Sequence, residues 1–150
     1  MGARDLGDLG GRALLELGCG HGAIIRALAT TFPRGNFCGL DFSPGQLELA
    51  RRETGHLANV RYLLWDARLG LPDGLAPFDD LLSVYGALDF FADPSSMLSA
   101  FLAGLRPGGI CCILTSVELV YDATVRHPRL DVWRNETVGS HWFVRAGLTS

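Results

Sequence analysis

The chain contains no lysine, and all thirteen of its basic residues are arginine. Chemistry that depends on a lysine amine, such as Schiff-base catalysis, is therefore excluded. The sequence also has no apolar stretch of about 18 residues, the length that a membrane-spanning helix requires. No signal peptide is expected, because residues 1–5 lead into glycine and aspartate rather than into an apolar run. These absences predict a cytoplasmic protein with no membrane partner.

Cysteine is scarce, and none of the four cysteines belongs to a Cys-x-x-Cys pair. Cys38, Cys111 and Cys112 fall in apolar runs that are typical of buried strands. Cys19 lies in a glycine-rich segment. Without paired spacing, a zinc site is not indicated. We expect all four cysteines to be reduced, small core residues, and we expect no bound metal.

A basic surface is missing as well, because 16 acidic residues outnumber the 13 basic ones and give a net charge of -3. This balance gives no reason to expect a nucleic acid or an anionic membrane as a partner. The 150 residues are 48% hydrophobic and 19% charged, which is ordinary for a globular protein. Residues 1–150 are therefore predicted to form a single domain with its own core.

Glycine, by contrast, is concentrated in one informative segment. The apolar run Leu14–Leu17, interrupted by Glu16, leads into Gly18-Cys19-Gly20-His21-Gly22, and a helix is predicted to follow from Ala23 to Ala29. Because glycine has no Cβ, such a turn lets backbone N–H groups approach a ligand closely. A second apolar run, Asn36–Asp41, ends in an acid about 20 residues after the glycines. That spacing is typical of a carboxylate that accepts hydrogen bonds from a ribose diol.

Strand-like runs alternate with helix-like runs along most of the chain. The predicted strands are Arg12–Leu17, Asn36–Asp41, Val60–Trp65, Asp80–Tyr85 and Ile110–Thr115. This alternation predicts an α/β fold with a doubly wound, mostly parallel sheet.

Two helices have clear start signals. Ser43 is the expected N-cap of one, with Pro44 at its first position and Gln46 completing a capping box, and this helix is expected to end near Thr54. Asp93 is the expected N-cap of the other.

The pattern is weaker after residue 116. Val117–Val125 is expected to be a loop or an irregular strand. Asp131–Val138 and His141–Leu148 are predicted to form an antiparallel hairpin, because apolar and polar side chains alternate in the second segment.

Four motifs then occur in a recognisable order: Glu16–Gly22, Gly39–Pro44, Trp65–Ala67 and Leu105–Gly109. Together they resemble the class I S-adenosylmethionine (SAM)-dependent methyltransferases, above all the small-molecule type, over about residues 13–116. The resemblance implies a Rossmann-like sheet in the order 3-2-1-4-5 and SAM as the cofactor. It also implies transfer of a methyl group to an O, N or C atom of a small-molecule acceptor.

The resemblance also assigns roles to individual residues. Glu16 would lie near the methionine amine, Asp41 would hold both ribose hydroxyls, and Phe42 would pack on the adenine. Asp66 would accept a hydrogen bond from the adenine amino group, and Ala67 would supply a backbone N–H. The full set of cofactor-binding residues that it implies is Glu16, Gly18, Cys19, Gly20, Gly22, Asp41, Phe42, Gln46, Asp66, Ala67, Ser83 and Tyr85. Tyr85 and Asp89, which follow the fourth strand, are the candidates for orienting a nucleophile.

The C-terminal segment is rich in aromatic residues, namely Tyr121, Trp133, Trp142 and Phe143. They are expected either to pack against the edge of the sheet or to line an apolar acceptor pocket, with His141 or Arg145 as a polar contact.

Three alternatives remain at this point. Gly18-x-Gly20-x-x-Ala23 also fits the permissive fingerprint of a nicotinamide-dinucleotide domain, although Glu16 directly before the turn is more typical of methyltransferases. A nucleic-acid methyltransferase is disfavoured, because residues 83–86 read Ser-Val-Tyr-Gly where enzymes that methylate exocyclic amines carry an Asn/Asp-Pro-Pro-aromatic motif. A non-catalytic or truncated SAM-binding chain is the third alternative. Only eleven residues precede Arg12, and no clear sixth and seventh strand of the family fold is evident.

Overall fold

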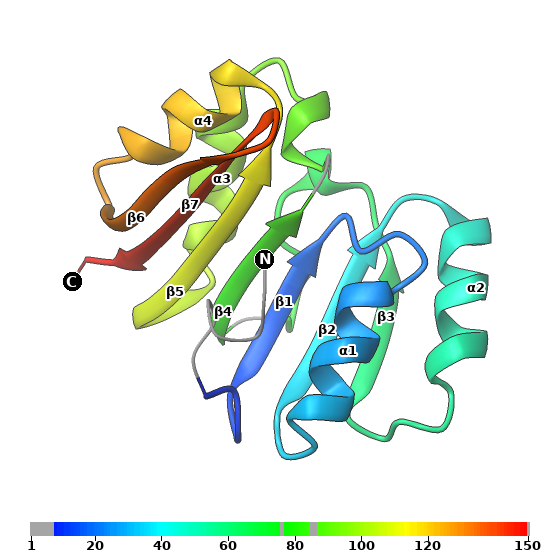
Figure 1. Cartoon of the computed structure of the whole chain (residues 1–150). Coiled ribbons are helices and arrows are strands. Elements are labelled where there is room, and N and C mark those ends of the chain that lie inside the picture. Colours follow the sequence, from blue (N-terminus) through cyan, green and yellow to red (C-terminus); the bar gives the residue numbers. More distant parts are fainter. Residues whose placement is uncertain (1–7, 76, 85–86, 150) are drawn as a thin grey trace.

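A computed structural model describes residues 8–75, 77–84 and 87–149 (Figure 1). The strands are β1 (Ala13–Leu17), β2 (Asn36–Asp41), β3 (Val60–Leu64), β4 (Phe78–Val84), β5 (Leu105–Thr115), β6 (Leu130–Val138) and β7 (His141–Leu148). The helices are α1 (Ala23–Thr31), α2 (Pro44–Thr54), α3 (Pro94–Leu102) and α4 (Glu118–Val125), with short 3₁₀ turns η2 (Ala67–Leu69) and η3 (Leu88–Phe90).

The strands form one seven-stranded sheet in the order β3-β2-β1-β4-β5-β7-β6. The pairs from β3 to β5 are all parallel, which confirms the predicted order 3-2-1-4-5. β7 pairs antiparallel with both β5 and β6, which confirms the predicted hairpin. The expectation that a sixth and a seventh strand would not be clear was wrong. β7 is an interior strand, and its Phe143, Val144 and Ala146 are buried.

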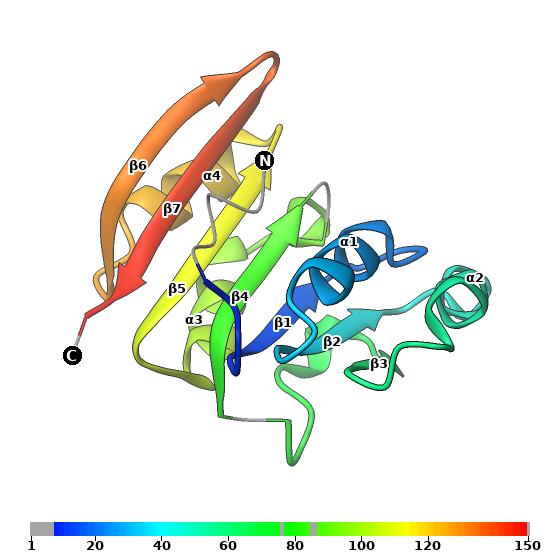
Figure 2. The same cartoon turned by 60° about the horizontal axis from the view of Figure 1, so that its bottom comes forward.

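Both faces of the sheet are covered, because consecutive residues of the central strands are buried and their side chains point to opposite faces. Leu14 packs with Ile25 of α1 and Leu47 of α2 on one face. Leu15 packs with Phe101 of α3 on the other face. Figure 1 shows α1 in front of the sheet and α3 behind it, and Figure 2 shows the same layers from below. No helix in the described ranges is long and apolar enough to cross a membrane.

The helix caps follow the sequence signals. The side chain of Ser43 accepts a hydrogen bond from the Gln46 N–H, and the side chain of Asp93 accepts one from the Ser96 N–H. All four cysteines are free and buried, as predicted.

The segment Val117–Val125 was predicted as a loop or an irregular strand, and this prediction was wrong. Residues from Glu118 onward form α4. Valine and threonine favour strands in isolation, and Val117 supplies no side-chain cap that would have marked a helix start. Val120 and Thr124 lie one turn apart and are both buried, so tertiary packing decides the conformation here.

β5 begins earlier than predicted, at Leu105 rather than at Ile110. Gly108 has a φ of 74°, and the pairing with β4 shifts register between Phe78 and Asp80. A bulge of this kind has no signal in the apolar pattern, because its exposed residues read as a turn.

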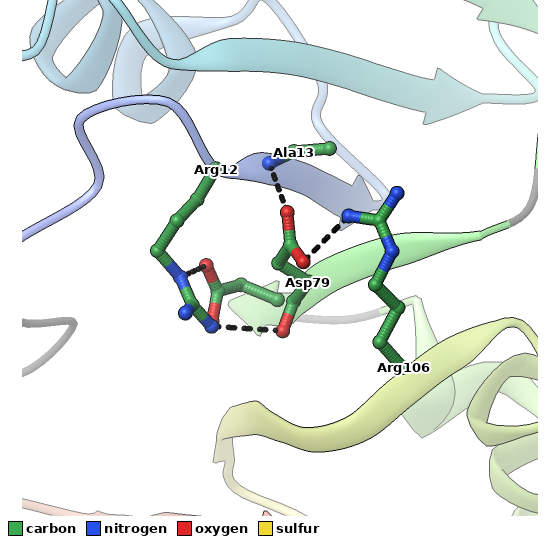
Figure 3. A network of polar contacts seen from close by, with 5 residues as sticks. Arg12, Ala13, Asp79 and Arg106 are labelled. Carbon is green, nitrogen blue, oxygen red and sulfur yellow. Dashed lines mark hydrogen bonds and ion pairs between the residues drawn. The ribbon is translucent and has the colours of Figure 1, made fainter.

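A network of polar contacts joins β1, β4 and β5 at their amino ends (Figure 3). The Arg12 guanidinium donates to both carboxylate oxygens of Asp80, each at 2.7 Å. The Asp79 carboxylate accepts from the Ala13 N–H at 2.7 Å and from Arg106 at 2.6 Å. Burial raises the pKa of Asp80, and the hydrogen bonds from Arg12 oppose that shift. The network ties the amino ends of β1, β4 and β5 together.

Candidate functional site

The main cavity lies at the carboxyl ends of β1, β2 and β3 and encloses about 410 Å³. It is lined by Leu17, Gly18, Gly20, Leu40, Asp41, Phe42, Trp65, Asp66, Ala67, Arg68, Ala87, Phe90 and Phe91. In open α/β sheets this edge is where ligands bind.

The glycine turn contributes Gly18 and Gly20 to the lining of the cavity. Gly18, Gly20 and Gly22 all have positive φ angles, of 74°, 52° and 76°. The Gly18 N–H donates to the Leu40 carbonyl at 2.8 Å, which ties the turn to β2. A Cβ on Gly18 would lie 2.6 Å from the Ala87 Cβ, and one on Gly22 would lie 2.3 Å from the Tyr62 hydroxyl. The turn therefore requires glycine for both conformation and space.

Gly18→Ala is expected to abolish ligand binding in this cavity, because the new methyl group meets Ala87 at its wall. Gly11→Ala is the matched control, since Gly11 has a φ of 81° but nothing within 4 Å of its Cβ position. Left-handed strain alone should cost each variant about 1–2 kcal/mol of unfolding free energy. Urea denaturation and calorimetric titration would measure both quantities. Equal binding by Gly18→Ala and Gly11→Ala would contradict this description of the cavity wall.

Asp41 lies at the end of β2 with its carboxylate at the cavity. Its Oδ2 accepts from the Gly20 N–H at 2.8 Å, and its Oδ1 accepts from the Ser43 N–H at 2.9 Å. Each carboxylate oxygen offers about two acceptor positions, so each retains one for a ligand. The backbone thus holds the carboxylate in place at the cavity.

Phe42 and Asp66, two of the predicted cofactor-binding residues, both line the cavity. Phe42 is 74% exposed, so its ring is not a core residue. Asp66 accepts hydrogen bonds from the Arg68 guanidinium at 2.6–3.0 Å, and these lower its pKa. Asp66 therefore presents to the cavity a carboxylate that is already paired with Arg68. Sequence reasoning missed Arg68, whose only signal is its place two residues after Asp66 in a 3₁₀ turn.

Glu16 is 2% exposed and lies beneath the glycine turn. Its Oε2 atom is buried without a hydrogen-bond partner among the described residues. Burial, together with the nearby Asp41 carboxylate, raises the pKa of Glu16 to about 8. A carboxyl group in this state is suited to receive a cation.

Three other predicted site residues, Cys19, Gln46 and Ser83, are not part of the lining of the cavity. The side chain of Cys19 is buried against the position of Gly39, and Ser83 is buried within β4. Gln46 extends from α2 toward Gly20. Tyr85 lies outside the described residues.

Asp89 is half-buried, and its Oδ1 accepts a hydrogen bond from the Thr115 hydroxyl at the end of β5. Its neighbours Phe90 and Phe91 reach the cavity wall, and Phe90 is 83% exposed. Sequence reasoning did not select these two phenylalanines, because a pair of aromatic residues usually indicates core.

The C-terminal aromatics pack on the hairpin. Tyr121 stacks on Trp142 with ring centroids 5.3 Å apart, and the Arg145 guanidinium lies over Trp133 at 5.4 Å. Phe143 is buried. None of them lines the main cavity, which favours the edge-packing interpretation over the acceptor-pocket one. The described part of the chain holds no group of three histidine, cysteine or acidic side chains arranged for a metal ion.

Comparison with known proteins matches residues 15–111 to the family model described as "Methyltransferase domain". A trans-aconitate 2-methyltransferase from Methylobacterium radiotolerans is 34% identical over 102 residues, which span 68% of this chain and 37% of that protein. A tRNA (guanine-N(7)-)-methyltransferase from Anaeromyxobacter dehalogenans is 34% identical over 148 residues, which span 89% of this chain and 68% of that protein. The chain thus spans well under half the length of the first relative.

The fold is also similar to that of solved structures. The N-methyltransferase NodS from Bradyrhizobium japonicum, in complex with S-adenosyl-L-homocysteine, superimposes with a TM-score of 0.77 at 16% identity. The similarity covers 93% of this chain and 79% of NodS. At this identity the comparison supports the architecture alone.

Proposed function

The chain belongs to the class I SAM-dependent methyltransferases, and from this membership we propose that it transfers a methyl group from SAM to an O, N or C atom of a small molecule. The cofactor is SAM. One observation carries the proposal above all others. The glycine turn and the Asp41 carboxylate meet at one cavity, and both Asp41 oxygens keep an acceptor position for a diol.

The residues present fit the cofactor. Asp41 would hold the ribose, Phe42 would cover one face of the adenine, and the Ala67 N–H and Asp66 would bind its edge. Glu16, with its unpartnered buried oxygen, would face the ammonium group of the methionine tail. When bound, SAM supplies a methyl group that its positive sulfur activates for displacement.

The main contribution of this chain to the rate of methyl transfer would then be to position the acceptor against the methyl group. Phe90 and Phe91 would exclude water from the reacting end of the cavity. Asp89, held by the Thr115 hydroxyl, would take the proton of an acceptor that must lose one. Tyr85 is the second candidate for this role.

The net charge of -3 supports a small molecule as the acceptor over RNA, because a phosphate backbone requires a positive surface. The relative that acts on tRNA makes RNA the alternative to test.

The test begins with calorimetric titration of SAM into the protein, where we expect saturable 1:1 binding. The protein is then incubated with SAM labelled on its methyl group, against a panel of metabolites and against total tRNA. We expect label transfer and release of S-adenosylhomocysteine with the metabolites only. Absence of SAM binding would refute the proposal, transfer to tRNA would replace the acceptor class, and binding without any turnover would favour a non-catalytic chain.

With an acceptor in hand, Asp89→Asn is expected to lower kcat and to flatten its pH profile, while Asp122→Asn on the exposed side of α4 leaves both unchanged. Full rate at every pH in Asp89→Asn, and also in Tyr85→Phe, would exclude both residues as the base.

A further inference from the structure

Glu16 occupies an unusual place for an acid. It lies in the middle of the sheet, in register with Gly39 of β2 on one side and Leu82 of β4 on the other. Leu15 and Leu17 belong to the core cluster on the α3 face, so alternation places Glu16 on the α1 face, directly under the glycine turn. The two residues that follow it, Leu17 and Gly18, line the cavity.

The ionisable groups that surround Glu16 do not neutralise it. They are Asp41 from the end of β2, Cys19 from the glycine turn and Tyr62 from β3. None of these is a cation, and burial raises the pKa values of Cys19 and Tyr62, which keeps both neutral. The nearest basic residue on α1, Arg26, is paired with Glu53 at the surface. Among the described residues, no arginine forms an ion pair with Glu16.

Both the ionised and the protonated form of Glu16 are energetically unfavourable in the free protein. An ionised Glu16 would be a buried anion beside a second carboxylate, Asp41, and both effects favour the protonated form. A protonated Glu16 still leaves a buried oxygen without a hydrogen-bond partner. A cationic hydrogen-bond donor that arrives from the cavity removes both costs at once.

We propose that Glu16 is protonated in the free protein and loses its proton when the ammonium group of the cofactor binds, so that it selects ligands with an amino-acid tail. The O–H bond of the carboxyl group breaks, the proton passes to solvent, and the resulting carboxylate pairs with the ammonium. This inference rests on the proposed function, since it takes SAM as the ligand. It goes beyond that function by coupling cofactor binding to the release of a proton.

A pKa of about 8 leaves roughly nine tenths of Glu16 protonated at pH 7. Binding of SAM at this pH is therefore expected to release close to one proton. The association constant is expected to rise roughly tenfold between pH 6 and pH 7, because binding releases a proton and a lower proton concentration favours that release.

Calorimetric titrations at pH 7 in buffers of different ionisation enthalpy measure the number of protons released. SAM should release close to one, whereas methylthioadenosine, which carries the adenosine but no amino-acid tail, should release none. Glu16→Gln should bind SAM with almost no proton release and with an affinity that no longer rises from pH 6 to pH 7. Glu48→Gln, at an exposed position on α2, is the matched control and should behave like the natural chain.

SAM binding without proton release by the natural chain would overturn the inference, and so would a full proton released by Glu16→Gln. A separate measurement does not depend on the cofactor. The carboxyl ¹³C shift of Glu16 in the free protein should titrate with a midpoint near 8, and a midpoint near 4.5 would overturn the inference even if SAM binds. If SAM does not bind and the midpoint is near 8, the proposed function and the selection of an ammonium fail, while protonation of Glu16 in the free protein stands.

Discussion

Arg12→Ala is expected to lower the free energy of unfolding by about 3–5 kcal/mol, because it leaves a buried carboxylate without its cation. The Asp80 side chain is 0% exposed, and Arg12, at 32%, supplies both of its short hydrogen bonds. Arg12 also donates to the Asp79 carbonyl at 3.2 Å, so its loss loosens the start of β4. Urea denaturation followed by circular dichroism measures this change.

Arg106→Ala is the control within the same network. Arg106 pairs with Asp79 nearer the surface and is 48% exposed, so its loss should cost no more than about 1 kcal/mol. The double variant Arg12→Ala, Asp80→Ala should be less destabilised than the sum of its single variants, because no buried charge is left unpaired. Equal losses of unfolding free energy for Arg12→Ala and Arg106→Ala would contradict the claim that burial of Asp80 makes the Arg12 pair the more important one.

Asp41→Ala is expected to weaken SAM binding by about 2–3 kcal/mol, which is about 30- to 150-fold, because it removes charge-assisted hydrogen bonds to the ribose. The Asp41 carboxylate also holds the Gly20 N–H, so part of this loss reflects a looser glycine turn. Calorimetric titration of SAM measures the affinity.

Asp41→Asn keeps the size of the side chain and removes its charge. Asparagine keeps one acceptor oxygen for the backbone but offers the diol an N–H donor in place of the second oxygen. One of the two backbone N–H groups that Asp41 binds then loses its acceptor, so we expect Asp41→Asn to lower the thermal stability less than Asp41→Ala does, while it still loses most of the affinity for SAM. Unchanged affinity in Asp41→Ala would remove Asp41 from the cofactor site.

The sequence predicted best where a residue type is needed for a local reason. The glycines of the turn have no substitute at positive φ, Ser43 and Asp93 cap helices through their own side chains, and Asp41 ends an apolar run at an informative spacing. Each of these signals involves only a few neighbouring residues, so it can be interpreted without knowledge of the tertiary structure.

The sequence predicted poorly where contacts between distant segments decide. Helix α4 forms because Val120 and Thr124 fit against the sheet, although their intrinsic preference is for strands. Arg12 and Asp80 are 68 positions apart in the sequence, and no local pattern predicts that they pair. Arg68 reaches the cavity through a turn whose geometry the sequence does not reveal.

The order β5-β7-β6 has a consequence for the order of events during folding. β1, β2 and β3 find their neighbours after one intervening helix each, so this half of the sheet can assemble while the chain is still being made. β5 is different, because its outer neighbour, β7, is the last of the described strands. β6 is synthesised before β7, and in the described part of the chain it pairs only with β7, which lies between β5 and β6 in the sheet. The exposed backbone donors and acceptors on the outer edge of β5 therefore remain unpaired until residues 141–148 have been synthesised and β7 pairs with them.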